Sequence, residues 1–173
     1  LSPEFLAEVH GMKHKNLAAA LLQRLLEDEV RARGRRNVVQ ARKFSELLEK
    51  AISRYQNRTI ESAQVIEELI EIARQFRDAD KKGEELSLSK DEAAFYEALA
   101  ENESAEKVIG DTQLALIARE LTRLVRDNAT VDWNHKKSVQ AKLRVLVKKV
   151  LRKHGYPPDA QQKATELVLE QAK

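Results

Sequence analysis

"TIESAQVIEELIEIARQF", residues 59–76, is the longest stretch of the chain with a regular apolar pattern. Its apolar side chains recur every three or four residues, and this spacing places them on one side of an α-helix. They are Ile60, Ala63, Ile66, Leu69, Ile70, Ala73 and Phe76. Glutamates and Arg74 lie nearer the opposite side, so the stretch predicts a surface helix of an antiparallel bundle.

The composition of the whole chain favours the same fold class. Of the 173 residues, 42% are hydrophobic, 34% are charged and only 5% are aromatic, and no stretch alternates as a β-strand does. We therefore predict an all-α fold, a single irregular bundle of seven or eight helices, several of them antiparallel. The chain is long enough for one core, and because it opens with Leu1 rather than Met, we expect one domain excised from a longer chain.

Capping residues, glycines and prolines divide the chain into helices. We expect Ser2, Asn16, Ser89 with Glu92, Asp111, Asp132 and Asp159 to begin helices, and Gly34 and "GYPP" (155–158) to end them. The predicted helices cover about residues 3–9, 16–34, 37–57, 59–76, 89–100, 111–125, 132–153 and 159 to the C-terminal end. The stretch "DADKKGEELSLS" (78–89) is predicted to form a polar connection closed by Ser89, and residues 105–109 a short turn.

Two absences in the sequence limit the kind of protein. There is no cysteine, so neither a disulfide framework nor a thiolate metal site is proposed, and an intracellular compartment fits. The longest apolar run is "LAAALL" (17–22), far short of the ~20 residues that span a bilayer. We expect a cytoplasmic protein with no membrane partner.

The charge of the chain is unevenly distributed. Residues 132–173 hold ten Lys/Arg and four Asp/Glu, whereas residues 1–131 hold 21 and 24. Between Lys136 and Lys153 there is no acidic residue at all. A basic end of this kind is a candidate contact for phosphate or for an acidic partner.

The helix predicted over residues 132–153 has one apolar and one cationic side. Its inward residues would be Val139, Leu143, Leu146, Val147, Val150 and Leu151, and its outward cations Lys142, Arg144, Lys148, Lys149, Arg152 and Lys153. Two interpretations stay open. The cations are solvated or neutralised by glutamates of the same domain, or they bind DNA or an acidic protein surface. Arg152 and Lys153 also favour the helix dipole without any ligand.

A second basic cluster is "RARGRRNVVQARK", residues 31–43. Its cations are Arg31, Arg33, Arg35, Arg36, Arg42 and Lys43. An arginine fork suits bidentate pairing with phosphate or carboxylate. The alternative is ion pairing within the domain, with Glu27, Asp28 and Glu29 one turn earlier.

The remaining candidates for chemistry are weaker. Tyr55 in "RYQNR" (54–58) could stack on a base, but its position on the apolar stripe favours packing. His10 and His14 have the spacing of helical metal ligands but lack a third ligand nearby. The carboxylates of Glu67, Glu68 and Glu71 would need a shielded cleft to act as an acid and base pair of a hydrolase.

Several blocks of the sequence resemble one known family. "YQNR" (55–58), "LSKDEAAFYEALA" (88–100) and "DW" (132–133) leading to "GYPP" occur in the order found in the C-terminal helical domain of the restriction (motor) subunit of type I restriction-modification enzymes. The resemblance covers essentially all of residues 1–173. It implies that the endonuclease and ATPase parts, with their ATP and Mg, lie upstream, and that this fragment contains no catalytic residue, cofactor site or metal site.

The resemblance also implies a function. We expect a non-catalytic assembly module that docks the ATP-dependent translocase and endonuclease onto the methyltransferase core for DNA restriction. Its partners would be the methyltransferase subunit, the upstream helicase-like domains and, in an alternative reading, double-stranded DNA gripped by the basic helix faces as a clamp. The parent chain would be a subunit of an ATP-dependent type I site-specific deoxyribonuclease.

Overall fold

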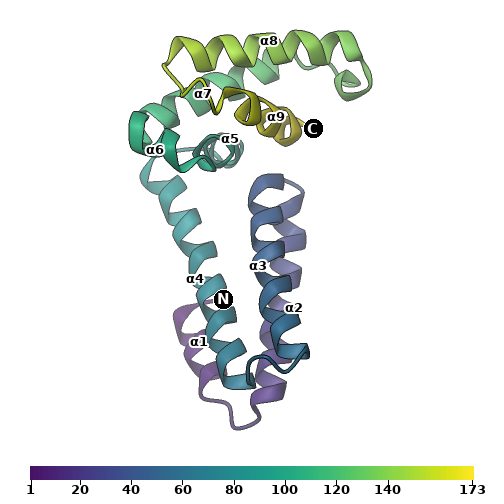
Figure 1. The fold of residues 1–173 in the computed structure, drawn as a ribbon, viewed down its shortest axis with the longest axis vertical. Helices are drawn as coiled ribbons and strands as arrows, with labels where there is room; N and C mark the ends of the chain where they lie inside the picture. Colours follow the sequence, from purple (N-terminus) through teal and green to yellow (C-terminus); the bar gives the residue numbers. More distant parts are fainter. The chain divides into compact units, whose positions relative to one another are not determined.

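The protein is described here from a computed structural model that covers all of residues 1–173 (Figure 1). It contains nine α-helices, one short 3-10 helix and no strand, which confirms the all-α class. The predicted number of helices was too low because residues 103–109, expected to be a turn, form a capped helix of their own. None of the helices is long and apolar enough to cross a membrane.

The chain divides into two compact units. Unit 1 consists of residues 1–35 and 40–82, and unit 2 of residues 36–39 and 83–173. The expectation of a single domain stays a prediction.

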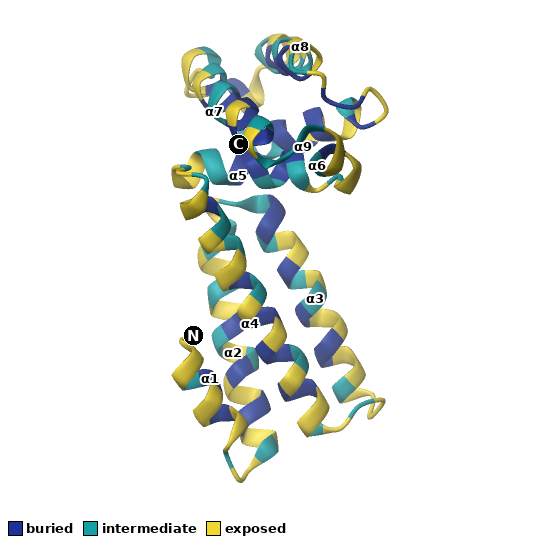
Figure 2. Cartoon of the chain, turned by 90° about the vertical axis from the view of Figure 1, so that its left-hand side faces the viewer, coloured by how far each residue is buried: buried dark blue, intermediate teal, exposed yellow.

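Unit 1 is built from four helices: α1 (Pro3–His10), α2 (Lys15–Gly34), α3 (Val38–Gln56) from Gln40 onward, and α4 (Ser62–Glu85) up to Lys82. Their buried residues follow one side of each helix (Figure 2). At the centre of this core the rings of Phe44 and Phe76 stack with centroids 3.9 Å apart. The opening stretch packs as predicted through Ile66, Leu69, Ile70, Ala73 and Phe76, whereas Ala63 is exposed.

Two local predictions in unit 1 were wrong. Asn16 does not cap α2, because the helix begins one residue earlier, and the Asn16 side chain instead accepts a hydrogen bond from the Tyr55 hydroxyl at 2.6 Å. Residues 78–85 continue α4 rather than forming a polar connection. Gly83, which lies in unit 2, is buried within this helix, and the space at its Cα faces Ala93 of the same unit.

Unit 2 contains α5 (Lys90–Ala100), α6 (Glu103–Ile109), α7 (Asp111–Asn128), the 3-10 helix (Trp133–His135), α8 (Lys137–Lys153) and α9 (Gln161–Ala172). Helix α5 packs against α7 and α9, and α8 packs against the same two helices. The predicted capping box at the start of α5 is present, with Ser89 and Glu92 each bonded to the backbone of the other. This core fixes α8 on its apolar side.

Three other predicted caps in unit 2 were wrong. Asp111 is the first residue of α7 rather than its cap, and its carboxylate accepts a hydrogen bond from the Tyr96 hydroxyl at 2.7 Å. Asp132 precedes the 3-10 helix, so Lys136 stands before α8 and makes no side-chain cap. Helix α9 begins at Gln161, two residues after Asp159.

The "GYPP" segment ends α8 as predicted. Gly155 has a φ of 73°, which glycine adopts without strain, and the Tyr156 amide donates to the Leu151 carbonyl at 2.9 Å. The Tyr156 side chain is buried, and its hydroxyl donates to the Leu99 carbonyl of α5 at 2.7 Å. This bond ties the end of α8 to α5.

Candidate functional site

Helix α8 packs its apolar side against the other helices of unit 2, and its cationic side faces outward. Leu143, Val147, Val150 and Leu151 are buried, and Val139 and Leu146 are half-buried, as the sequence predicted. Trp133, just before α8, packs with Leu143 and with Leu169 of α9. The cationic side is therefore held in position by contacts on the opposite side of the helix.

Helices on either side neutralise the two edges of the cationic face. On one edge the Arg144 guanidinium donates to Glu166 of α9 at 3.0 and 3.4 Å. On the other edge Lys153 pairs with Glu120 of α7 at 3.3 Å. At about 100° per residue, Arg144 and Lys153 lie on opposite sides of α8, so these two ion pairs bound the outward face.

Glu120 is the centre of a small polar network at the end of α8. The ring of His154 donates from Nε2 to Glu120 at 2.5 Å, and its Nδ1 accepts from the Gln113 amide at 3.0 Å. The hydrogen bond from His154, and then that from Lys153, lowers the pKa of Glu120 below its ordinary value. Glu120 is therefore a carboxylate that stays ionised and holds one edge of the basic face.

Between these edges lies a face of α8 with four cations that make no ion pair and one exposed valine. We call these five residues the α8 strip, and they are Lys142, Val145, Lys148, Lys149 and Arg152. The five positions fall within an arc of about 120° and span about 15 Å of helix. Val145 lies among the four cations with 64% of its surface exposed. The strip is thus a cationic face with an apolar centre.

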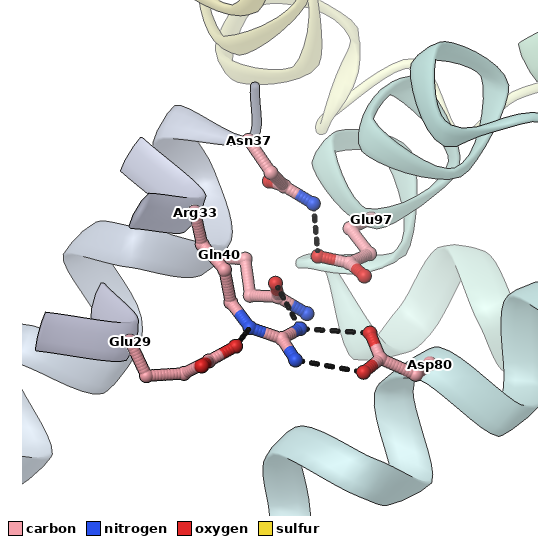
Figure 3. Close-up of polar contacts among 6 residues, drawn as sticks. All are labelled: Glu29, Arg33, Asn37, Gln40, Asp80 and Glu97. Carbon is pink, nitrogen blue, oxygen red and sulfur yellow. Dashed lines mark hydrogen bonds and ion pairs between the residues drawn. The ribbon is translucent and has the colours of Figure 1, made fainter. Parts of the chain in front are cut away.

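The second basic cluster has a different arrangement, and Arg33 of unit 1 shows it most clearly (Figure 3). Its guanidinium donates to Glu29 at 2.7 Å, to both carboxylate oxygens of Asp80 at 2.7 Å, and to Gln40 at 3.0 Å. It also lies 4.6 Å from the ring centroid of Phe76. Burial alone lowers the pKa of Arg33, but the bonds to Asp80 and Glu29 outweigh burial and raise it.

The other cations of residues 31–43 are only partly engaged. Arg31 pairs with Asp28 at 3.3 Å, and the Lys43 ammonium lies 5.8 Å from the ring centroid of Phe44. Arg42 also has an interaction partner. Arg35 and Arg36 are exposed and make no ion pair. The ion-pairing interpretation therefore holds for Arg31 and Arg33 and does not hold for Arg35 and Arg36.

Residues 36–39, which belong to unit 2, are held there by side chains of α5 and α9. The Asn37 amide donates to Glu97 at 2.8 Å, as Figure 3 shows, and the Val38 amide donates to Gln171 at 2.8 Å. The Gln171 side chain in turn donates to the Arg36 carbonyl at 2.5 Å. The backbone of this connecting segment is thus held by hydrogen bonds within unit 2.

The whole chain is similar to one known protein family. Residues 1–173 match the family described as type I restriction enzyme HindI endonuclease subunit-like, C-terminal. The chain belongs to this family. It is 36% identical over 172 residues to the HindI endonuclease subunit of Haemophilus influenzae, a match that covers 99% of this chain and 16% of that protein.

A second relative of this restriction-enzyme family comes from an archaeon. The chain is 34% identical over 156 residues to the putative MjaIXP endonuclease subunit of Methanocaldococcus jannaschii, covering 90% of this chain and 15% of that protein. The chain therefore spans about one sixth of the length of these relatives. No solved structure matches it.

The structure also shows the surroundings of the weaker candidates for base stacking, metal binding and acid–base chemistry. Tyr55 is half-buried against the core of unit 1 and bonded to Asn16, which fits the packing interpretation. His10 contacts Glu67, and no group of three His, Asp or Glu side chains could hold a metal ion. Glu67 and Glu71 are exposed, and Glu68 pairs with Arg54, so the hydrolase interpretation lacks its shielded cleft.

One residue of the α8 strip was not predicted from the sequence. Val145 lies outside the predicted inward arc of α8 and is exposed. A helical wheel could have found it, because this valine falls between Lys148 and Lys149 on the cationic side. The prediction missed Val145 because it listed only the charged residues of the outward face.

Proposed function

We propose that this region is an assembly module without an active site of its own. It docks the restriction subunit onto the methyltransferase core of a type I restriction-modification complex. In the parent chain, ATP hydrolysis, translocation and DNA cleavage, with their ATP and Mg, belong to the upstream domains. Family membership and the unpaired α8 strip support this proposal.

The main support for the proposal is that four cations on α8 have no carboxylate partner. Lys142, Lys148, Lys149 and Arg152 make no ion pair, while the neighbouring Arg144 and Lys153 do. Exposed charges of one sign attract an oppositely charged partner and select its orientation. Because the apolar side of α8 is packed in unit 2, the cations keep their spacing when a partner arrives.

The test neutralises the strip in the full-length subunit. The variant K142Q/K148Q/K149Q/R152Q keeps helix-forming side chains of similar length and removes only the charges. We expect it to bind the purified methyltransferase more weakly by about tenfold or more, because several charge contacts are lost together. Size exclusion would show a smaller joint peak, and titration would give the change in affinity.

A matched control removes the same number of charges elsewhere. Lys13, Arg24, Lys50 and Lys107 are exposed and make no ion pair. The variant K13Q/R24Q/K50Q/K107Q should bind methyltransferase as the parent does. Equal binding by the strip variant and the parent would reject the proposed function.

A second candidate function is a DNA-backbone clamp, which the same unpaired cations would serve. Phosphate contacts make the logarithm of affinity fall with log salt by about 0.9 per contact. The clamp predicts that the strip variant loses duplex binding and that its salt slope becomes shallower by about 4. If the strip variant and the parent bind a random duplex equally at low salt, the clamp is excluded.

A further inference from the structure

We infer that the α8 strip receives an acidic helix of a partner protein, with Val145 as the apolar anchor of the contact. This inference rests on the proposed docking function and specifies the chemistry of the occupant. It begins with the exposure of Val145, whose surface is 64% accessible in the middle of four cations.

An exposed valine among cations suits a protein partner better than a phosphate backbone. Burial of such a side chain is favourable, but only against another apolar group. The lysines add aliphatic stems beside it while their ammonium groups stay at the rim. A phosphate backbone offers no apolar surface to cover this centre, whereas an interface between proteins has an apolar core and a charged rim.

The carboxylates at the two edges limit the width of the occupant. Glu166 of α9 lies on one side of the strip and Glu120 of α7 on the other, each bonded to an α8 cation. Helices pack at axial distances of about 8–10 Å, so a single helix can lie along α8 between these edges. A duplex presents phosphates over a broader surface and would bring some of them toward the two carboxylates.

The spacing of the strip matches the surface period of a helix. Lys142, Val145, Lys149 and Arg152 are separated by three, four and three residues. A partner helix with an apolar residue flanked at three or four residues by Asp or Glu would place opposite charges over these positions. The strip length of about 15 Å corresponds to about three turns of such a helix.

The test compares Val145→Ser with the strip variant in the full-length subunit. We expect Val145→Ser to weaken methyltransferase binding by about tenfold at both low and high salt, since an apolar contact is little screened. Its binding to a random duplex should stay as in the parent. Val131→Ser is the matched control, because Val131 is 98% exposed and lies outside the strip.

The outcomes separate this inference from the proposed function. If neutralising the cations weakens binding but Val145→Ser does not, docking stands and the apolar anchor is rejected. If neither variant weakens binding, the proposed function fails as well. Equal loss of methyltransferase and duplex binding by Val145→Ser would assign the strip to nucleic acid.

A photo-crosslinking residue at position 145 tests the nature of the occupant. In the assembled complex it should attach to a helical segment of the methyltransferase rich in Asp and Glu. Attachment to a basic segment, to a strand or to DNA would overturn the inference. Circular dichroism of every variant must match that of the parent, since Val145 is an exposed position that the fold does not need.

Discussion

The two basic segments of this chain look alike in sequence and differ in the structure. Residues 31–43 and α8 each carry six candidate cations, yet Arg33 of unit 1 is held by two carboxylates, an amide and an aromatic ring. On α8 only the cations at the two edges have carboxylate partners. The two segments differ because of the carboxylates near them. Glu29 and Asp80 lie within reach of Arg33, whereas the cations in the middle of α8 have no carboxylate partner.

This comparison shows that a run of cations has no single meaning. A guanidinium surrounded by acceptors stabilises its own unit and keeps little hydrogen-bond capacity for a partner, because most of its five N–H groups are already used. An ammonium on an isolated stripe contributes little to the fold and remains available. Loss of charge should therefore affect a different property in each segment. At Arg33 it should lower the stability of the fold, and on the α8 strip it should weaken binding of a partner.

The largest effect should come from Arg33→Ala. This change removes the partner of Asp80 and Glu29 and the contact with Phe76, and the Arg33 side chain is only 18% exposed. Breaking a buried ion pair costs about 3–5 kcal/mol, and because Asp80 is itself exposed we expect a loss of about 2 kcal/mol in the free energy of unfolding. Urea unfolding measures it.

Two further variants test whether the Arg33 network is the cause. Arg33→Lys should recover only part of the loss, because one ammonium cannot reproduce the fork on Asp80 and the bond to Glu29 together. Arg31→Ala should change stability by less than about 0.5 kcal/mol, since its side chain is 76% exposed. Similar stabilities of Arg33→Ala and Arg31→Ala would remove the contrast between the two segments.

The next effect concerns the anchor that holds the end of α8. Tyr156→Phe removes the bond to the Leu99 carbonyl and leaves that acceptor without its partner, at a cost of about 1 kcal/mol in unfolding free energy. Binding of methyltransferase should change far less than in the strip variant. If Tyr156→Phe weakened binding as strongly as loss of the strip cations, position rather than charge would explain the role of α8.

Tyr156 also gives the chain a predictable response to alkali. Burial, with smaller effects from Asp159 and Glu101, raises the pKa of Tyr156 to about 12, above its ordinary value of 10.0. The unfolded chain loses this proton first, so the contribution of Tyr156 to stability is present below pH 10 and is lost as the pH rises toward 12. Unfolding in denaturant at pH 8 and 11 should show a smaller loss for Tyr156→Phe than for the parent.

The sequence predicted the helices better than it predicted their ends. Apolar periodicity identified most inward residues of α4 and α8, because the buried side of a helix follows the spacing of its apolar residues; Ala63 is the exception in α4. The predicted caps at Asn16 and Asp111 were wrong because each side chain bonds to another partner instead of the helix backbone. Asn16 and Asp111 bond to tyrosines distant in the sequence, which no local pattern reveals.

The candidate site was predictable as a basic face but not as a strip. Which cations are paired depends on Glu166 and Glu120, and these lie on α9 and α7. Sequence alone cannot show that α8 packs against both helices, so it cannot divide the six cations into edge and centre. The family resemblance was confirmed, whereas the docking role stays a prediction.

Among the contacts of α8, the smallest effect should come from the edge pairs themselves. Glu166→Gln and Glu120→Gln each remove the partner of one α8 cation, and such exposed pairs contribute less than about 1 kcal/mol. The lowered pKa of Glu120 means that its contribution is present above the ordinary carboxyl pKa of about 4.5 and is lost as the pH falls below it. Comparing unfolding at pH 7 and pH 3.5 should therefore show less acid sensitivity in Glu120→Gln than in the parent.

The same two variants, Glu166→Gln and Glu120→Gln, add free cations to the borders of the strip, so they should bind an acidic partner at least as tightly as the parent does. Weaker binding would mean that the edge carboxylates themselves contact the partner, and the contrast between a neutralised border and a free centre would no longer hold.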